Sequence, residues 1–227
     1  MRYVISDIHG YFGLFRALLK KIGFSDCDEL YILGDIIDKG PESVRLLEYV
    51  ASMPNAYAMR GNHEEAFLQY YASLMAESED YDAVLDSLRK YFADDGHLLS
   101  WELVDYLEAL PYYIEENDFI CVHAGVPLLP DGHIPPLESI EVEELIYNRR
   151  FRCADVLPVD SKTVFFGHTS LSEPRFTAYT RKENPHDIRD FIKIHLDLGT
   201  FDSGVLGCFC IDDCSSYYVT KRDIAEE

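Results

Sequence analysis

The chain contains 227 residues, of which 48% are hydrophobic and 27% charged, the balance of an ordinary globular protein with one core. Acidic residues outnumber basic ones by 41 to 20, and the net charge of -21 argues against a nucleic-acid polymer or an anionic membrane as partner. No segment approaches the roughly 18 apolar residues of a membrane span, and no signal-peptide pattern is evident. We therefore expect one domain, residues 1–227, located in the cytoplasm and of undetermined oligomeric state.

The first part of the chain alternates β-rich and amphipathic segments. Strands are predicted at residues 2–6, 29–33 and 56–59, and a helix is predicted at 12–22. A second helix should begin near Pro41, because proline at the first helical position lacks an N–H that would need a partner. This βαβ rhythm predicts a parallel sheet.

The middle of the chain has a helical pattern over 62–109, with one apolar stripe between Val84 and Phe92. We interpret residues 66–109 as a helical insertion. The remainder is rich in strands, which are predicted at 111–115, 118–122, 163–167, 191–197, 205–211 and 216–220. A parallel half followed by an antiparallel half in one compact domain fits this order best.

The cysteines and four of the eight histidines show no site pattern. The six cysteines lack paired CxxC spacing, so we expect reduced thiols rather than disulfides or a zinc finger. A soft-metal site at Cys208, Cys210 and Cys214 is the less favoured alternative. The four histidines expected to be surface or ordinary strand residues are His97, His133, His186 and His195.

Five short polar blocks each follow an apolar strand directly. They are DIHG at 7–10, GDIIDKG at 34–40, GNHE at 61–64, HAG at 123–125 and GHT at 167–169. Ligands of α/β proteins gather at the carboxyl ends of the strands, so blocks far apart in sequence can meet at one edge. One such block alone means little, because turns with glycine and aspartate are common, but five in order predict a shared site.

The blocks supply imidazole, carboxylate and amide groups without thiolate, a ligand set suited to manganese, iron, zinc or magnesium. We expect two divalent ions, with manganese as first choice and iron or zinc as alternatives, bridged by Asp35. A hydroxide held between them would be the nucleophile, because metal coordination lowers the pKa of water towards about 7. The other expected ligands are Asp7 and His9 on one ion, and Asn62, His123 and His168 on the second.

Three residues in or next to these blocks remain for substrate chemistry. His63 is expected to be the general acid, and Asp38 the carboxylate that fixes its tautomer and raises its pKa. Arg60 is expected to hold the phosphate oxygens. Together they predict hydrolysis of a phosphate ester. A non-catalytic metal-binding scaffold is an alternative, but a scaffold has no reason to retain these three residues as a set.

From Asp7 to His168 the blocks resemble those of the metal-dependent phosphoprotein phosphatases, the serine/threonine phosphatases among the calcineurin-like metallophosphoesterases. Their blocks are usually written GDxHG, GDxVDRG, GNHE, HGG or HAG, and GH. The resemblance implies an α/β fold with a central β-sandwich flanked by helices, a dinuclear centre at the ligands named above, and direct attack without a phosphoenzyme. It also implies a phosphate-binding arginine in LIYNRRF at 145–151, where Arg149 is the choice and Arg150 the alternative.

Two departures from the family pattern bear on the substrate. Ser6 replaces a glycine, and Lys39 replaces an arginine. We expect Lys39 to contact phosphate as a point charge, without the two-pronged contact of a guanidinium. Related symmetrical diadenosine tetraphosphatases typically lack the carboxylate found here at Asp38. Its presence favours a serine/threonine protein phosphatase-like phosphomonoesterase, acting on a phosphorylated protein or a small phosphoester, over a diadenosine polyphosphate hydrolase.

Overall fold

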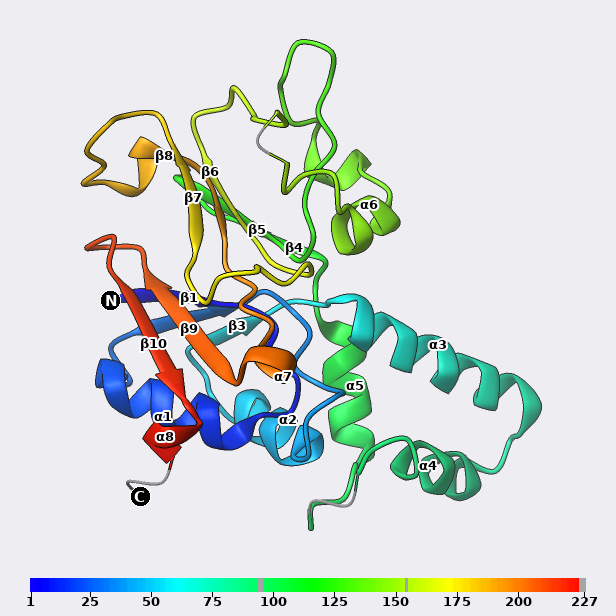
Figure 1. The fold of residues 1–227 in the computed structure, drawn as a ribbon. Helices are drawn as coiled ribbons and strands as arrows, with labels where there is room; N and C mark the ends of the chain where they lie inside the picture. Colours follow the sequence, from blue (N-terminus) through cyan, green and yellow to red (C-terminus); the bar gives the residue numbers. More distant parts are fainter. Residues whose placement is uncertain (94–95, 154, 225–227) are drawn as a thin grey trace.

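The computed structural model describes residues 1–93, 96–153 and 155–224. Two five-stranded sheets pack against each other, and helices lie outside them (Figure 1). The fold is therefore the β-sandwich flanked by helices that the sequence resemblance implied. A core of apolar side chains from both sheets fills the space between them, among them Val4, Tyr31, Phe119, Phe165 and Phe209.

The first sheet has the strand order β10-β9-β1-β2-β3. Strands β1 (Arg2–Ile5), β2 (Glu29–Ile32) and β3 (Ala56–Ala58) run parallel, as the βαβ pattern predicted. Strand β9 (Val205–Cys210) returns from the far end of the chain and pairs antiparallel with both β1 and β10 (Ser216–Thr220). The chain thus closes one side of its first sheet with its last strands.

The second sheet has the order β4-β5-β6-β8-β7. Strands β5 (Phe119–Val122), β6 (Thr163–Phe166) and β8 (Phe191–His195) are parallel, whereas β4 (Tyr113–Glu115) and β7 (Thr177–Thr180) pair antiparallel at the edges. The expectation of a parallel half followed by an antiparallel half is therefore wrong. Both sheets are mixed. The strands that precede the later blocks are parallel, and the last two strands of the chain pair antiparallel in the first sheet.

Helices α1 (Phe12–Ile22) and α2 (Ser43–Ala51) cover the outer face of the first sheet, together with the short α8 (Lys221–Ile224) (Figure 1). Gly23 ends α1 in the left-handed conformation, with φ 62°, which glycine adopts without a steric penalty. Short helices lie in the loops around the second sheet and at the sheet edge: α6 (Val142–Tyr147), α7 (Thr200–Ser203), η1 (Leu137–Ser139) and η2 (Ile188–Asp190).

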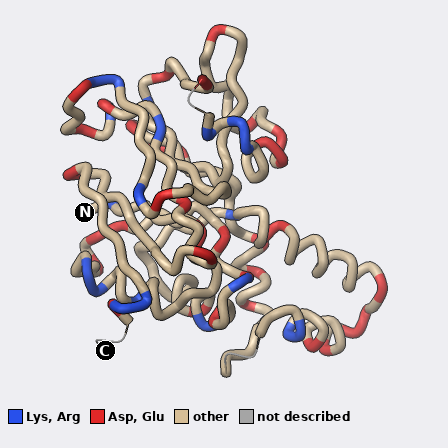
Figure 2. The backbone as a smooth tube through the Cα atoms, in the orientation of Figure 1, with Lys and Arg blue, Asp and Glu red and all other residues tan. Residues whose placement is uncertain are grey.

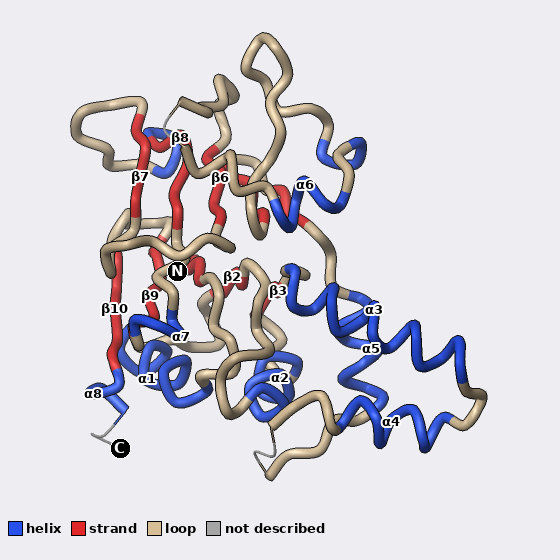
Figure 3. The backbone as a smooth tube through the Cα atoms, turned by 45° about the vertical axis from the view of Figure 1, so that its right-hand side comes forward, coloured by secondary structure: helices blue, strands red, loops and turns tan. Residues whose placement is uncertain are grey.

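The stretch expected to be helical contains α3 (Asn62–Glu77), α4 (Tyr81–Arg89) and α5 (Trp101–Ala109), which confirms its helical content. Helices α3 and α4 extend sideways from the sandwich (Figure 3). The predicted stripe is buried at Val84, Leu85 and Leu88. The insertion as predicted, 66–109, also includes residues 94 and 95, which lie outside the described residues.

Acidic residues are distributed along much of the chain, including the turn between α3 and α4 (Figure 2). All six cysteines are free thiols. Among the described residues, no helix is both long and apolar enough to cross a membrane.

Candidate metal centre

The strands deliver the polar blocks to one edge of the sandwich. Both sheets contribute, because the blocks follow parallel strands of each. The backbone turns sharply there, and non-glycine residues with positive φ, which are uncommon and gather at functional sites, are frequent. They are Asp7 (43°), His9 (50°), Asp35 (51°), Asp38 (70°), Lys39 (61°) and His168 (68°).

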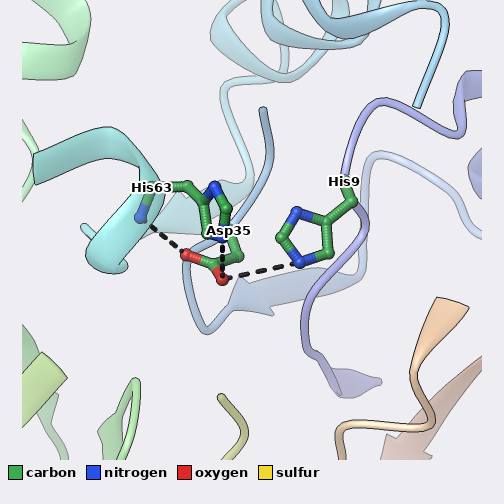
Figure 4. Close-up of side chains that lie close together, drawn as sticks. All are labelled: His9, Asp35 and His63. Carbon is green, nitrogen blue, oxygen red and sulfur yellow. Dashed lines mark hydrogen bonds and ion pairs between the residues drawn. The ribbon is translucent and has the colours of Figure 1, made fainter. Parts of the chain in front are cut away.

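Asp35 lies in the middle of this edge with a side chain that is only 3% exposed. Its Oδ2 lies 3.5 Å from Nε2 of His9 and 3.9 Å from Nε2 of His63 (Figure 4), and its Oδ1 lies 3.5 Å from Nε2 of His123. Burial alone would raise the pKa of Asp35, but the imidazoles of His123, His9 and His63 outweigh burial and lower it. The carboxylate is thus ionised and faces histidines on two sides.

His9 and His123 both present Nε2 to the site. Nδ1 of His9 donates to the carbonyl of Ile37 at 3.0 Å, and Nδ1 of His123 donates to the carbonyl of Leu33 at 2.8 Å. Since a carbonyl only accepts, these bonds fix the ring proton on Nδ1 and leave the lone pair on Nε2. Burial lowers the pKa of His9 to about 4, so its ring is neutral at pH 7, as a metal ligand must be.

Asn62 lies between the imidazole of His123 and a further imidazole, that of His168. Its Oδ1 lies 2.9 Å from Nε2 of His123 and 2.8 Å from Nδ1 of His168. Burial, and next the charge of His123, lower the pKa of His168 to about 3, with Asp35 opposing and Arg149 adding to the decrease. Three predicted ligand residues thus meet on this side of Asp35.

Two more carboxylates lie beside the centre. Asp7 is 2% exposed and accepts hydrogen bonds from the Ser6 hydroxyl and from the His168 N–H, the latter at 3.2 Å. Burial, then Asp197 and then Asp35 raise its pKa well above the ordinary range. Asp197 is itself 3% exposed, and burial raises its pKa as well. The neighbourhood therefore concentrates carboxyl groups that are removed from water, and burial favours their protonated forms.

Sequence reasoning assigned no role to Asp197. The available signal was its place two residues after His195, which does not predict depth in the fold. His195 itself ends β8 and stacks on Phe166, with ring centroids 4.5 Å apart, so it is the strand residue that was expected.

Glu64 is a second residue whose role the sequence did not reveal. It is fully buried, and its carboxylate accepts the backbone N–H groups of Asp35 (2.8 Å), Ile36 (2.8 Å), Ile37 (3.2 Å) and Gly61 (2.9 Å). It therefore holds the second and third blocks together. The GNHE block contained this signal, but the four partners are visible only in three dimensions.

The expected acid and its partner carboxylate are in contact. Nδ1 of His63 lies 2.8 Å from Oδ2 of Asp38, and the same oxygen accepts the hydroxyl of Tyr91 at 3.1 Å. Burial alone would lower the pKa of His63, but the bond to Asp38 and the charge of Asp35 outweigh burial and raise it. His63 is therefore biased towards its protonated form.

Arg60 does not lie where a phosphate ligand was expected. Its guanidinium donates to the hydroxyl of Tyr112 (2.8 Å), to Glu65 (3.1 Å) and to the carbonyls of Leu107 (3.3 Å) and Glu108 (2.7 Å), and it lies over the Tyr112 ring. These contacts tie the loop after β3 to the end of α5. The structure gives no support to phosphate binding by Arg60, because protein acceptors occupy both terminal nitrogens and Nε is buried.

Lys39 and Arg149 remain as exposed cations at the centre. Nζ of Lys39 lies 2.7 Å from Nε2 of His9. Arg149 is close enough to His168 to lower the pKa of that ring, as described above. Arg150 instead donates its backbone N–H to Asn148 at 3.1 Å. Of the two arginines that the sequence left open, Arg149 is the one with an electrostatic connection to the centre.

A pocket of about 830 Å³ opens beside His168. Tyr147 forms part of its wall, and the ring centroid of Tyr147 lies 6.0 Å from that of His168. The lining combines apolar side chains, including Val126, Leu128 and Phe151, with both arginines and with three carboxylates, Glu143, Glu144 and Asp155. The pocket could take a ligand that has an apolar part and places its negative charge at the two arginines rather than at the three carboxylates.

The side chains fit divalent cations. Two sets of three residues have ligand atoms within 4.8 Å of one another: His9, Asp35 and His63, and Asp7, Asp35 and His123. On His123 the unprotonated Nε2 faces carboxylate and amide oxygens, so lone pairs point at lone pairs, an arrangement that a cation between them would stabilise. The donor set contains no thiolate, which suits borderline or hard ions.

Comparisons with known proteins give the family of the chain. The calcineurin-like phosphoesterase family model matches residues 2–193. A symmetrical bis(5'-nucleosyl)-tetraphosphatase of Neisseria meningitidis is 33% identical over 145 residues, which cover 62% of this chain and 48% of the relative. The enzyme of that name from Buchnera aphidicola is 29% identical over 154 residues, or 66% of this chain and 53% of the relative. The chain thus spans about half the length of these curated relatives.

A solved structure shows the same fold. A crystal structure provisionally described as a diadenosine tetraphosphatase matches with a TM-score of 0.71 at 20% sequence identity, and the match covers 96% of this chain and 92% of the other. Together with the family match over most of the sequence, this establishes that the chain belongs to the calcineurin-like phosphoesterase family.

Proposed function

We propose that the protein is a metal-dependent hydrolase of dinucleoside polyphosphates. The observation that carries this function is the pocket beside His168, which has an apolar wall suited to a nucleoside. Its lining also includes two arginines suited to the phosphates, alongside the carboxylates of Glu143, Glu144 and Asp155. The names of the curated relatives support the same substrate class. The sequence alone favoured a phosphomonoesterase and kept this substrate as the alternative, so the preference is now reversed.

Within this function, the residues around Asp35 would hold two divalent ions, with manganese as first choice and iron or zinc as alternatives. When bound, the ions supply a water of lowered pKa as nucleophile and neutralise charge on the phosphates. Lys39 and Arg149 offer further positive charge to the polyphosphate chain. The proposed ligands are Asp7, His9, Asp35, Asn62, His123 and His168, whose geometry is given above.

His63 is the proposed acid. Asp38 holds Nδ1, so Nε2 carries the transferable proton, and Nε2 lies 3.9 Å from the Asp35 carboxylate at the centre. With a dinucleoside tetraphosphate, a water molecule loses one proton to solvent as its oxygen bonds to one of the two central phosphorus atoms, and the bond from that phosphorus to the bridging oxygen breaks. The electron pair stays on the bridging oxygen, which takes the proton from His63. The products are two nucleoside diphosphates.

A phosphomonoesterase, acting on a phosphorylated protein or a small phosphoester, is the second candidate. The intact contact between His63 and Asp38 favours it, because an alkoxide leaving group needs a proton more than a nucleoside diphosphate does. The pocket beside His168 has no specific use in that reaction. We therefore rank the phosphomonoesterase function second.

A substrate panel separates the two. With manganese present, kcat/KM is measured on diadenosine tetraphosphate, on a phosphoserine peptide and on glycerol phosphate. We expect the dinucleotide to be preferred by at least about tenfold, which corresponds to about 1.4 kcal/mol, with ADP as the only nucleotide product. A preference for the phosphopeptide would select the second candidate instead. ATP plus AMP as products would exclude cleavage between the two central phosphates of the dinucleotide.

A further inference from the structure

The helical insertion supports an exposed aromatic surface. Tyr70 on α3 and Tyr91, two residues beyond α4, are 37% and 36% exposed, and their rings stack with centroids 5.7 Å apart and planes at 29°. Phe67 is fully buried beneath them, with its ring centroid 5.3 Å from that of Tyr91 and 5.2 Å from that of Phe92. The two tyrosines therefore rest on a packed aromatic base, which limits their freedom to reorient.

This surface lies next to the proposed acid. The Tyr91 hydroxyl donates to the same Asp38 oxygen that contacts His63, at 3.1 Å and 2.8 Å respectively. Because His63 must face the oxygen that leaves, the rest of the leaving group extends over residues beside His63. Tyr91 is one of these residues, and Tyr70 continues the surface outwards.

We propose, building on the dinucleoside polyphosphate hydrolase function, that Tyr70 and Tyr91 form a stacking surface for the purine base of the nucleoside diphosphate that leaves. Stacking on a tyrosine ring is tolerant of base identity and does not depend on hydrogen bonds to the base edge. The pocket beside His168 then receives the other nucleoside. The two identical nucleosides of one substrate would therefore bind at two different places on the protein.

Tyr70 provides the cleaner test, because the structure shows no hydrogen bond from its side chain to the candidate catalytic groups. For Tyr70→Ala we expect kcat/KM on diadenosine tetraphosphate to fall roughly 5- to 150-fold, the range for loss of one base stacking contact. The inhibition constant of ADP should rise, while that of inorganic pyrophosphate, which has no base, should rise much less. Tyr70→Phe keeps the ring and should restore kcat/KM to near the wild-type value.

Tyr57 offers a matched control, since it is 43% exposed and stacks on Tyr31 with centroids 5.3 Å apart, but lies on β3. Tyr57→Ala should leave both inhibition constants unchanged. If Tyr70→Ala hydrolyses the dinucleotide within twofold of wild type, the stacking surface is excluded and the proposed function stands. An equal effect on pyrophosphate would also exclude it. If the wild-type protein does not hydrolyse the dinucleotide at all, both proposals fail.

Discussion

At the scale of single residues, Asp35 is the group on which the centre depends most, because it contacts three histidines. Asp35→Asn should lower the metal content and abolish turnover, since a neutral amide bridges two dications poorly and leaves their repulsion less compensated. Elemental analysis and a phosphoesterase assay measure both effects. Asp86→Asn, on the exposed face of α4, is the control. Two bound metals with normal turnover in Asp35→Asn would exclude the bridging role.

His63 should affect chemistry and not metal binding. We expect His63→Asn to keep its metals and to lose roughly 10²- to 10⁴-fold in kcat on alkyl phosphates, the usual scale of general acid catalysis. Aryl phosphates and dinucleotides should lose less, because their leaving groups need less protonation. The measurement is kcat across leaving groups, together with metal content. Loss of metal from this variant would instead identify His63 as a ligand, which its proximity to His9 and Asp35 makes a real alternative.

Lys39 is expected to neutralise charge on the substrate. Its Nζ already reaches His9, yet the residue is exposed, so an anion can approach it. Removing one charge-assisted hydrogen bond costs on the order of 1.5 to 3 kcal/mol, so Lys39→Ala should lower kcat/KM roughly 10- to 150-fold with metals retained. Steady-state kinetics test this, with Lys20→Ala on α1 as control. Kinetics within twofold of wild type on every phosphoester would show that Lys39 is only a surface lysine.

Single residues also show where sequence reasoning stops. Residue type and order brought His63 and Asp38 together correctly, because the blocks fix both positions relative to the strand ends. The same reasoning misplaced Arg60, whose direction depends on Tyr112 and on two carbonyls at the end of α5. A block motif gives the position of a side chain along the chain, but its direction depends on partners that are distant in sequence.

At the scale of elements, Lys193 connects β8 to the loop that forms the pocket wall. It is fully buried, and its Nζ donates to the carbonyls of Phe151 (2.5 Å), Cys153 (2.8 Å) and Val156 (2.6 Å). The ammonium also lies over the rings of Phe151 and Tyr179, at 4.8 Å and 4.7 Å. Lys193 therefore ties β8 to the loop beyond Arg149.

Lys193→Met should destabilise the protein by about 1 to 3 kcal/mol near pH 7, because buried carbonyls lose their donor. Burial lowers the pKa of Lys193 to about 8, whereas lysine in the unfolded chain titrates near about 10.4. Between these values the unfolded chain binds more protons, so the stability of the wild type relative to Lys193→Met should rise with pH. Urea denaturation near pH 7 and near pH 10 measures this gap, the difference in free energy of unfolding between wild type and Lys193→Met. A gap that shrinks at high pH would contradict the assignment.

The elements themselves were predictable where apolar runs had clear boundaries. The strands before the blocks were found because each combines an apolar run with a polar block. Strand β7 was missed, because its residues Thr177–Thr180 alternate between half-buried and exposed positions at a sheet edge and contain little apolar sequence. The mixed pairing was also missed, because no local pattern indicates that β9 returns to β1.

At the scale of the whole molecule, the centre depends on two sheets that meet at one edge. Their parallel strands come from both halves of the chain, so the ligands assemble only when β1 to β3 and β5 to β6 pack together. Asp197 was not found from sequence because its depth is a property of this packing. The net charge of -21 still opposes polyanionic polymers, while local cations near the centre allow a small anion to bind.

The position of the metals tests this arrangement most directly. Crystals grown with manganese would be measured near the manganese absorption edge, and an anomalous difference map would locate the ions. We predict two peaks about 3.5 to 4 Å apart, the usual spacing of two-metal sites. Asp35 should contact both, with Asp7 and His9 at one and Asn62, His123 and His168 at the other. A single peak, or two peaks without a shared Asp35 ligand, would contradict the dinuclear centre.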